Sequence, residues 1–102
     1  MTSTVTQAFV VKLTAKPDTH DEVAQFLSGA VDLANAEAGT TVWFALRTDE
    51  STFWVVDAFP GPDERQAHLD GPIADALLQN ADRLLASAPE ILPADVLAAK
   101  VP

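Results

Sequence analysis

Asp57 is the least expected polar residue in this sequence, because it interrupts the apolar segment 53–59. If that segment is a strand, Val55 and Phe59 are its neighbours on one face, since side chains in a strand alternate between two faces. An acid in such surroundings is either held in a structural pair or acts as an acid or base in a pocket. In some hairpin registers Arg47 could be the partner in that pair.

The chain contains two histidines, and they differ in context. His20 lies beside two acids in the first turn of a predicted helix, which is typical of a surface residue. His68 lies in a short predicted helix, where a single histidine is most often structural but can also serve as a general base near neutral pH. The turn at 60–62 could fold this helix back over the sheet, and this would bring His68 close to Asp57. Cysteine is absent and no second histidine lies at ligand spacing, so no metal site is expected.

Aromatic residues concentrate around Asp57, because both tryptophans lie in the segment 40–59. Trp43, Trp54 and Phe59 are either core or dimer contacts, or walls that orient a flat ligand. Arg47 is a further candidate for ligand binding. No Gly-x-Ser-x-Gly sequence and no phosphate-binding glycine loop occur, so neither triad hydrolysis nor nucleotide binding is indicated.

These residues are positioned by alternating strand and helix patterns. The expected strands are 7–13, 40–48, 51–59 and 91–101, and the expected helices are 19–37, 62–69 and 73–86. This order predicts a ferredoxin-like α+β fold, an antiparallel sheet with helices on one face, in one domain spanning 1–102. Both faces of the central strands are apolar, so the uncovered face predicts a homodimer that packs sheet against sheet.

Several boundaries carry specific expectations. Thr19 and Glu22 have the spacing of a capping box, and Gly39 suits a left-handed residue at the end of the same helix. Pro93 cannot donate a ladder hydrogen bond, so the last strand is expected at a sheet edge or bulge. Residues 1–5 are expected to be a frayed lead-in.

Composition excludes several classes of partner. The formal net charge is -9 and the sequence pI is about 4.3, so the chain should repel nucleic acids and anionic membrane surfaces. No apolar run approaches the roughly 18 residues of a membrane span, and no secretory signal is present. The expected location is therefore the cytoplasm.

Taken together, the order of elements and several short strings resemble the antibiotic biosynthesis monooxygenase family of dimeric α+β barrels. The matching strings are Lys16-Pro17, Glu37-Ala38-Gly39, Thr52–Phe59 and Ala67-His68-Leu69. The family's third strand usually ends in an acid, one residue and a tryptophan, and its next helix carries an alanine–histidine pair. Here Asp57 replaces the commoner glutamate, Phe59 takes the tryptophan place and Trp43 the place of a frequent tyrosine. Gln7 is the nearest amide to the asparagine of haem-degrading relatives, so the haem reading is weakened.

The resemblance implies a homodimer with a pocket between sheet and helices in each protomer. The first hypothesis is a cofactor-independent monooxygenase that oxidises an aromatic, polyketide-like phenol or quinol with O2. His68 or Asp57 would be its base, and Trp43, Trp54 and Phe59 would be pocket walls. The alternative is a non-catalytic homodimeric module that binds a hydrophobic aromatic molecule, and a third option is an isomerase or cyclase on the same barrel.

Overall fold

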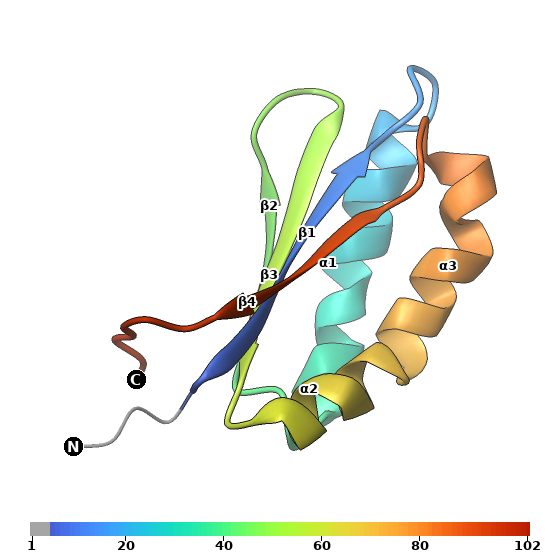
Figure 1. Cartoon of the computed structure of the whole chain (residues 1–102). Helices are drawn as coiled ribbons and strands as arrows, with labels where there is room; N and C mark the ends of the chain where they lie inside the picture. Colours follow the sequence, from blue (N-terminus) through green and yellow to red (C-terminus); the bar gives the residue numbers. More distant parts are fainter. Residues whose placement is uncertain (1–4) are drawn as a thin grey trace.

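A computed structural model describes residues 5–102, and in this part of the chain three helices cover one face of a four-stranded antiparallel sheet (Figure 1). The strands are β1 (Gln7–Thr14), β2 (Val42–Arg47), β3 (Thr52–Phe59) and β4 (Glu90–Asp95). The helices are α1 (His20–Ala36), α2 (Pro62–Leu69) and α3 (Pro72–Leu84). The strand order is β2-β3-β1-β4, so the expected ferredoxin-like α+β fold is confirmed.

The core lies between the sheet and the helices. Alternation sends every second side chain of β1 and β3 toward the helices, and apart from Ala8 these are the buried ones. The core residues include Phe9, Val11, Leu13, Phe53, Val55 and Phe59 of the sheet, with Val23 and Leu27 of α1 and Leu84 of α3. Phe9 and Phe59 meet edge to face, with ring centroids 6.1 Å apart.

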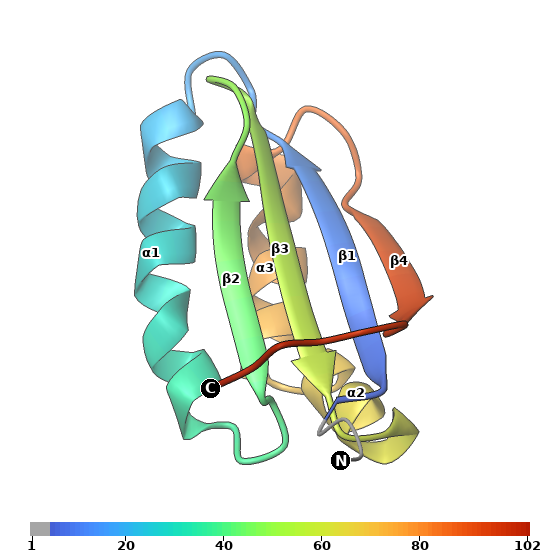
Figure 2. The ribbon, with the colours of Figure 1, turned by 90° about the vertical axis from the view of Figure 1, so that its left-hand side faces the viewer.

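The opposite face of the sheet is apolar, and no helix of the described chain covers it (Figure 1). Register pairs Phe44 with Val56, Leu46 with Trp54 and Val10 with Leu92 on that face. Phe44 is 56% exposed and Leu92 is 54% exposed, values that are unusual for residues of this size in a sheet. After β4 the chain end crosses in front of this face (Figure 2).

Two expectations about the chain ends need correction. The last strand ends at Asp95 rather than at residue 101, although β4 is an edge strand, as Pro93 predicted. Of the expected lead-in 1–5, residues 1–4 lie outside the described residues, and Val5 is buried rather than frayed.

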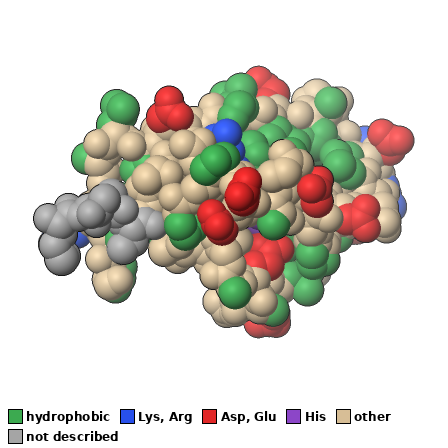
Figure 3. Space-filling model, turned by 60° about the horizontal axis from the view of Figure 1, so that its bottom comes forward, with side chains coloured by type: hydrophobic (Ala, Val, Ile, Leu, Met, Phe, Trp, Pro, Cys, Tyr) green, Lys and Arg blue, Asp and Glu red, His purple; other side chains and the backbone are tan. Residues whose placement is uncertain are grey.

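The molecular surface reflects the acidic composition. Viewed from the end at which α2 lies, it shows acidic side chains scattered between apolar ones (Figure 3). Among residues 5–102, no helix combines the length and the apolarity needed to cross a bilayer.

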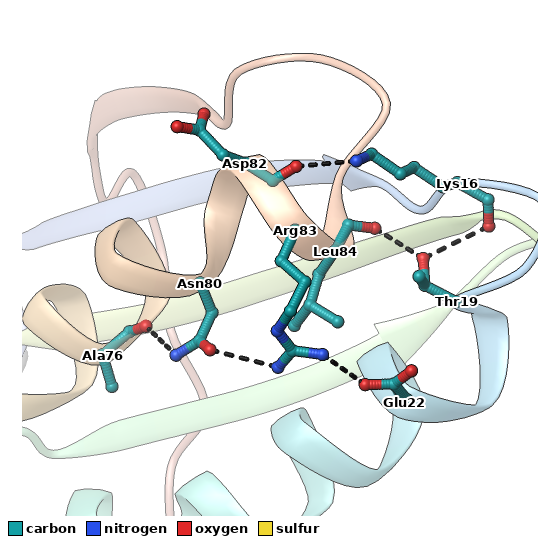
Figure 4. Close-up of polar contacts among 8 residues, drawn as sticks. All are labelled: Lys16, Thr19, Glu22, Ala76, Asn80, Asp82, Arg83 and Leu84. Carbon is teal, nitrogen blue, oxygen red and sulfur yellow. Dashed lines mark hydrogen bonds and ion pairs between the residues drawn. The ribbon is translucent and has the colours of Figure 1, made fainter.

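The start of α1 is tied to the end of α3 rather than capped locally (Figure 4). The Thr19 hydroxyl donates to the Leu84 carbonyl oxygen at 2.6 Å and makes no side-chain capping bond. Glu22 instead forms an ion pair with Arg83, so the predicted capping box is wrong. Gly39 is not left-handed either, because no described glycine has a positive φ.

Candidate functional site

Asp57 lies in the middle of the sheet and points toward the helices. In register it is opposite Phe9 on β1 and Trp43 on β2, so a strand flanks it on each side. It is only 1% exposed, which makes it one of the most deeply buried side chains of the described chain. A buried carboxylate in this position needs a strong hydrogen-bond partner.

His68 is that partner. The sharp turn after β3 starts α2 with Pro62 at its first position, and two acids in the first turn suit the helix dipole. The helix places His68, 8% exposed, against the Phe59 ring at a centroid distance of 5.2 Å. Nε2 of His68 lies 2.9 Å from Oδ2 of Asp57. The predicted approach of His68 to Asp57 is therefore confirmed.

A second carboxylate holds the other nitrogen of the same ring. Glu37 follows α1 directly, and its Oε1 lies 2.5 Å from Nδ1 of His68. The Thr40 hydroxyl donates to the same Oε1 at 2.8 Å and so helps to hold the carboxylate in place. The result is a chain of three hydrogen-bonded side chains, Asp57–His68–Glu37, assembled from β3, α2 and the end of α1.

The arrangement requires more protons than a neutral imidazole supplies. Each contact joins a ring nitrogen to a carboxylate oxygen, so each needs a proton between the two atoms, and neutral imidazole carries only one N–H. Burial lowers the pKa of His68, but hydrogen bonds and charges from Asp57 and Glu37 outweigh burial and raise that pKa above its usual 6.5. The two flanking carboxylates therefore favour the imidazolium form of His68.

An apolar cavity adjoins this group on the inner side. Its lining includes Asp57 and His68, and its other walls come from β1, β3, β4 and all three helices. It offers about 40 Å³ to the centres of water molecules, which is room for a few waters or one O2 molecule. Oδ1 of Asp57 is buried and makes no hydrogen bond, so it is available to a donor that enters the cavity.

Of the other predicted site residues, Trp43 and Phe59 lie near the Asp57–His68 pair, whereas Trp54 and Arg47 lie away from it. Trp43 is the register partner of Asp57 on the helix side and has a buried indole N–H without a partner, and Phe59 contacts His68. Trp54 lies on the uncovered face of the sheet, where its N–H donates to Thr48. None of these, nor Arg47, lines the cavity.

The suggested Arg47–Asp57 pair is wrong. Register places Arg47 opposite Phe53, at the hairpin end of the sheet. Its guanidinium donates to the backbone carbonyls of Asp49 and Glu50, and its side chain is exposed. Asp57 finds its counter-charge on α2 instead.

Comparison with known proteins places this chain in a family. No protein-family model matches the sequence, and no curated protein is significantly similar. A crystal structure of NE2512, a protein of unknown function from Nitrosomonas europaea, matches with 52% identity and a TM-score of 0.95. The match covers 97% of this chain and 96% of NE2512. The chain belongs to the family of NE2512.

More distant structures share the fold of this NE2512-family protein. A candidate antibiotic biosynthesis monooxygenase from Nitrosomonas europaea has a TM-score of 0.81 at 14% identity, over 90% of this chain and 99% of that one. A protein from Deinococcus radiodurans described in the same words has a TM-score of 0.81 at 13% identity, over 93% and 96% of the two chains. At such identities the likeness concerns the fold, which is the one that the sequence resemblance implied.

Glu37 is the site residue of this NE2512-family protein that sequence reasoning did not single out. In the sequence it belongs to the Glu37-Ala38-Gly39 string, which ends the first predicted helix and matches the antibiotic biosynthesis monooxygenase family, but the match itself indicates no role in the site. A local signal was present, because an acid at a helix C-terminus faces the negative end of the helix dipole and is expected to have another reason to be there. That reason is the imidazolium of His68, 31 residues further along the chain.

Proposed function

We propose that this protein is a cofactor-independent monooxygenase that oxidises an aromatic phenol or hydroquinone with O2. The observation that carries the proposal is the buried Asp57–His68 pair at the wall of an apolar cavity, with one carboxylate oxygen free to accept a substrate proton. The descriptions of distant structures with this fold as candidate antibiotic biosynthesis monooxygenases support the same reaction class.

The reaction needs a base and a dry site more than it needs a cofactor. When Asp57 takes the hydroxyl proton of a phenol or enol, the resulting anion can give one electron to O2, and the two radicals then combine. For an anthrone, conversion of the ring CH2 to C=O breaks two C–H bonds and the O–O bond. One oxygen atom becomes the carbonyl and the other leaves as water, so the substrate and O2 balance without another reductant. Apolar walls keep competing water away from the reactive anion.

The cavity must widen to admit such a ring, because its present volume suits O2 but not a polycyclic substrate. Leu69 at the end of α2 and Ile73 and Leu77 on α3 form part of its wall. Movement of these side chains away from the sheet would open it next to Asp57. Trp43 and Phe59 adjoin the Asp57–His68 pair without lining the cavity. The aromatic walls that we assign to hold the ring are therefore Phe9 and Phe26, which do line it.

Oxygen uptake with a panel of hydroquinones and anthrones tests this function. His68→Ala should lower turnover by roughly 10²–10⁴-fold, which is the usual contribution of a positioned acid or base. His20→Ala is the matched control, because it removes the other histidine, which lies at the start of α1. Uptake that survives both His68→Ala and Asp57→Asn in folded protein would refute the assignment of the base.

Phe59 in the monooxygenase family's tryptophan place and Trp43 in its tyrosine place favour a second candidate function, a homodimeric module that binds an aromatic molecule without turning it over. Two results together would favour this module: a hydroquinone quenches the tryptophan fluorescence of the wild-type protein when it binds, and the protein consumes no O2 with any substrate. For either function we infer a homodimer through the uncovered sheet face, whose exposed Phe44, Leu46 and Leu92 support it.

A further inference from the structure

His68 separates two hollows of different character. The inner one is the apolar cavity that Asp57 lines. The outer one is a groove of about 220 Å³, on the same measure, lined by Glu37, Thr40, Glu64 and Gly71 among others. His68 lines both hollows, whereas Asp57 lines only the inner one and Glu37 only the outer one.

The three side chains form a continuous hydrogen-bonded chain between the two hollows. Oδ2 of Asp57 contacts Nε2 of His68 at 2.9 Å, and Nδ1 on the opposite edge of the ring contacts Oε1 of Glu37 at 2.5 Å. Each carboxylate also has a second oxygen, Oδ1 of Asp57 and Oε2 of Glu37, that is buried without a partner. The two carboxylates bind opposite edges of one ring, and no described group of such side chains converges on a metal-sized point.

We propose that Asp57, His68 and Glu37 form a proton relay from the apolar cavity to the outer groove, with Glu37 as its solvent-side member. The nature of the proton donor rests on the proposed function. The relay provides an exit for a proton taken from a substrate, because Asp57 and His68 are the only polar ones among the described residues that line the apolar cavity. The relay also explains why a second carboxylate, Glu37, contacts the ring, since His68 acting alone as a base would not need one.

The transfer can be written with atoms and charge in balance. The substrate O–H bond breaks, an O–H bond forms on Asp57, and Asp57 loses its negative charge. The imidazolium of His68 then lacks one of its two counter-charges, so it gives up its Nδ1 proton to Glu37, and Glu37 passes a proton to water in the groove. One proton enters at the cavity and one leaves at the groove, and the reverse sequence resets the relay when reduced oxygen takes up the proton held by Asp57.

The charged groups around His68 suit this direction of transfer. Glu64 on α2 lines the groove and adds negative charge on the side where the proton leaves. Arg65, its neighbour on α2, donates to the backbone carbonyls of Ala8 and Ala94 and lies over the Phe9 ring. Its charge is therefore engaged by the sheet and not by the carboxylates of the relay.

A histidine titration tests the shared proton without any substrate. In wild-type protein, NMR of the ring nitrogens should show both N–H groups of His68 at pH 7. Glu37→Gln should lower the titration midpoint of His68, whereas Glu64→Gln should leave it near the wild-type position, because Glu64 lines the groove without contacting the ring. An unchanged midpoint in Glu37→Gln would overturn the relay.

Chemical rescue tests the direction of transfer. Glu37→Ala should lower oxygen uptake by roughly 10²-fold, and added formate should restore it in proportion to its concentration, because the groove has room for this small carboxylate. Asp57→Ala should not be rescued, since the substrate itself occupies the cavity that this side chain lines. Full activity in Glu37→Ala, or a loss that formate does not repair in folded protein, would refute the relay.

The two proposals fail separately. If wild-type protein consumes O2 but Glu37 variants behave as wild type, the monooxygenase stands and the relay falls. If wild-type protein consumes no O2, the monooxygenase falls, and the His68 titration still decides whether the three groups share their protons.

Discussion

Replacing Asp57 by asparagine is the sharpest single perturbation of this site, because it preserves shape and removes one charge. Asp57 is 1% exposed, and its Oδ2 lies 2.9 Å from Nε2 of His68, whose imidazolium form the two carboxylates favour. Hydrogen bonds to charged groups contribute about 1.5–3 kcal/mol. Asparagine can still present a carbonyl oxygen to Nε2, so we expect Asp57→Asn to lower the free energy of unfolding by about 1–3 kcal/mol at pH 6.5.

The size of this loss should depend on pH in a defined direction. Burial lowers the pKa of His68, but Asp57 and Glu37 raise it further, so the folded-state pKa lies above the usual 6.5. A raised pKa contributes stability that is complete below 6.5 and disappears as pH increases through the folded-state pKa. The deficit of Asp57→Asn should therefore be largest near pH 6.5 and shrink toward pH 9.

Chemical denaturation at fixed protein concentration, monitored by tryptophan fluorescence between pH 6.5 and 9, measures both effects. Asp32→Asn is the control, because it makes the same chemical change on the exposed side of α1. It should change stability by less than about 0.5 kcal/mol at every pH. A deficit for Asp57→Asn that is absent, or that grows as pH rises, would refute an imidazolium at His68.

Three further predictions concern other parts of the fold. Thr19→Val should lower the free energy of unfolding by about 1 kcal/mol, because it removes the buried hydrogen bond to the end of α3. Arg83→Ala should lower it by less than about 1 kcal/mol, because the ion pair with Glu22 is exposed. Equal losses for the two variants in thermal melts would contradict this ranking. Sedimentation equilibrium at micromolar concentration should give twice the chain mass of 10.8 kDa for the wild-type protein. Phe44→Glu should give the mass of one chain, because it places a charge on the exposed sheet face. A wild-type monomer would refute the homodimer. Elemental analysis should find no stoichiometric transition metal and haemin should give no saturable Soret shift, while a one-to-one haem complex would overturn the cofactor-free reading.

Much of the fold was predictable because its signals are local. Alternation placed Asp57 on the same face as Val55 and Phe59, and all three are buried in the structure. The turn after β3 and the proline at the start of α2 indicated how His68 could return to that face. Each of these inferences depends on residues that are close together in the chain.

The rest depended on contacts between distant segments. The hairpin register was open, so Arg47 could be suggested as the partner of Asp57 although it is at the far end of the sheet. Thr19 has the spacing of a local cap, but its hydroxyl bonds to Leu84, 65 residues away, because the end of α3 offers a buried carbonyl. Glu37 likewise gains its role only when α2 folds beside the end of α1.

The strict alternation along β3 has an evolutionary consequence. Asp57 faces the helices, and its neighbours Val56 and Ala58 face the other way, so deleting a single residue before Asp57 would exchange the two sets. The same deletion would move the carboxylate away from His68 and place a charge on the uncovered face. Drift in the length of this strand would damage both surfaces at once, so lineages of this protein should tolerate insertions in the β2–β3 loop far better than within β3.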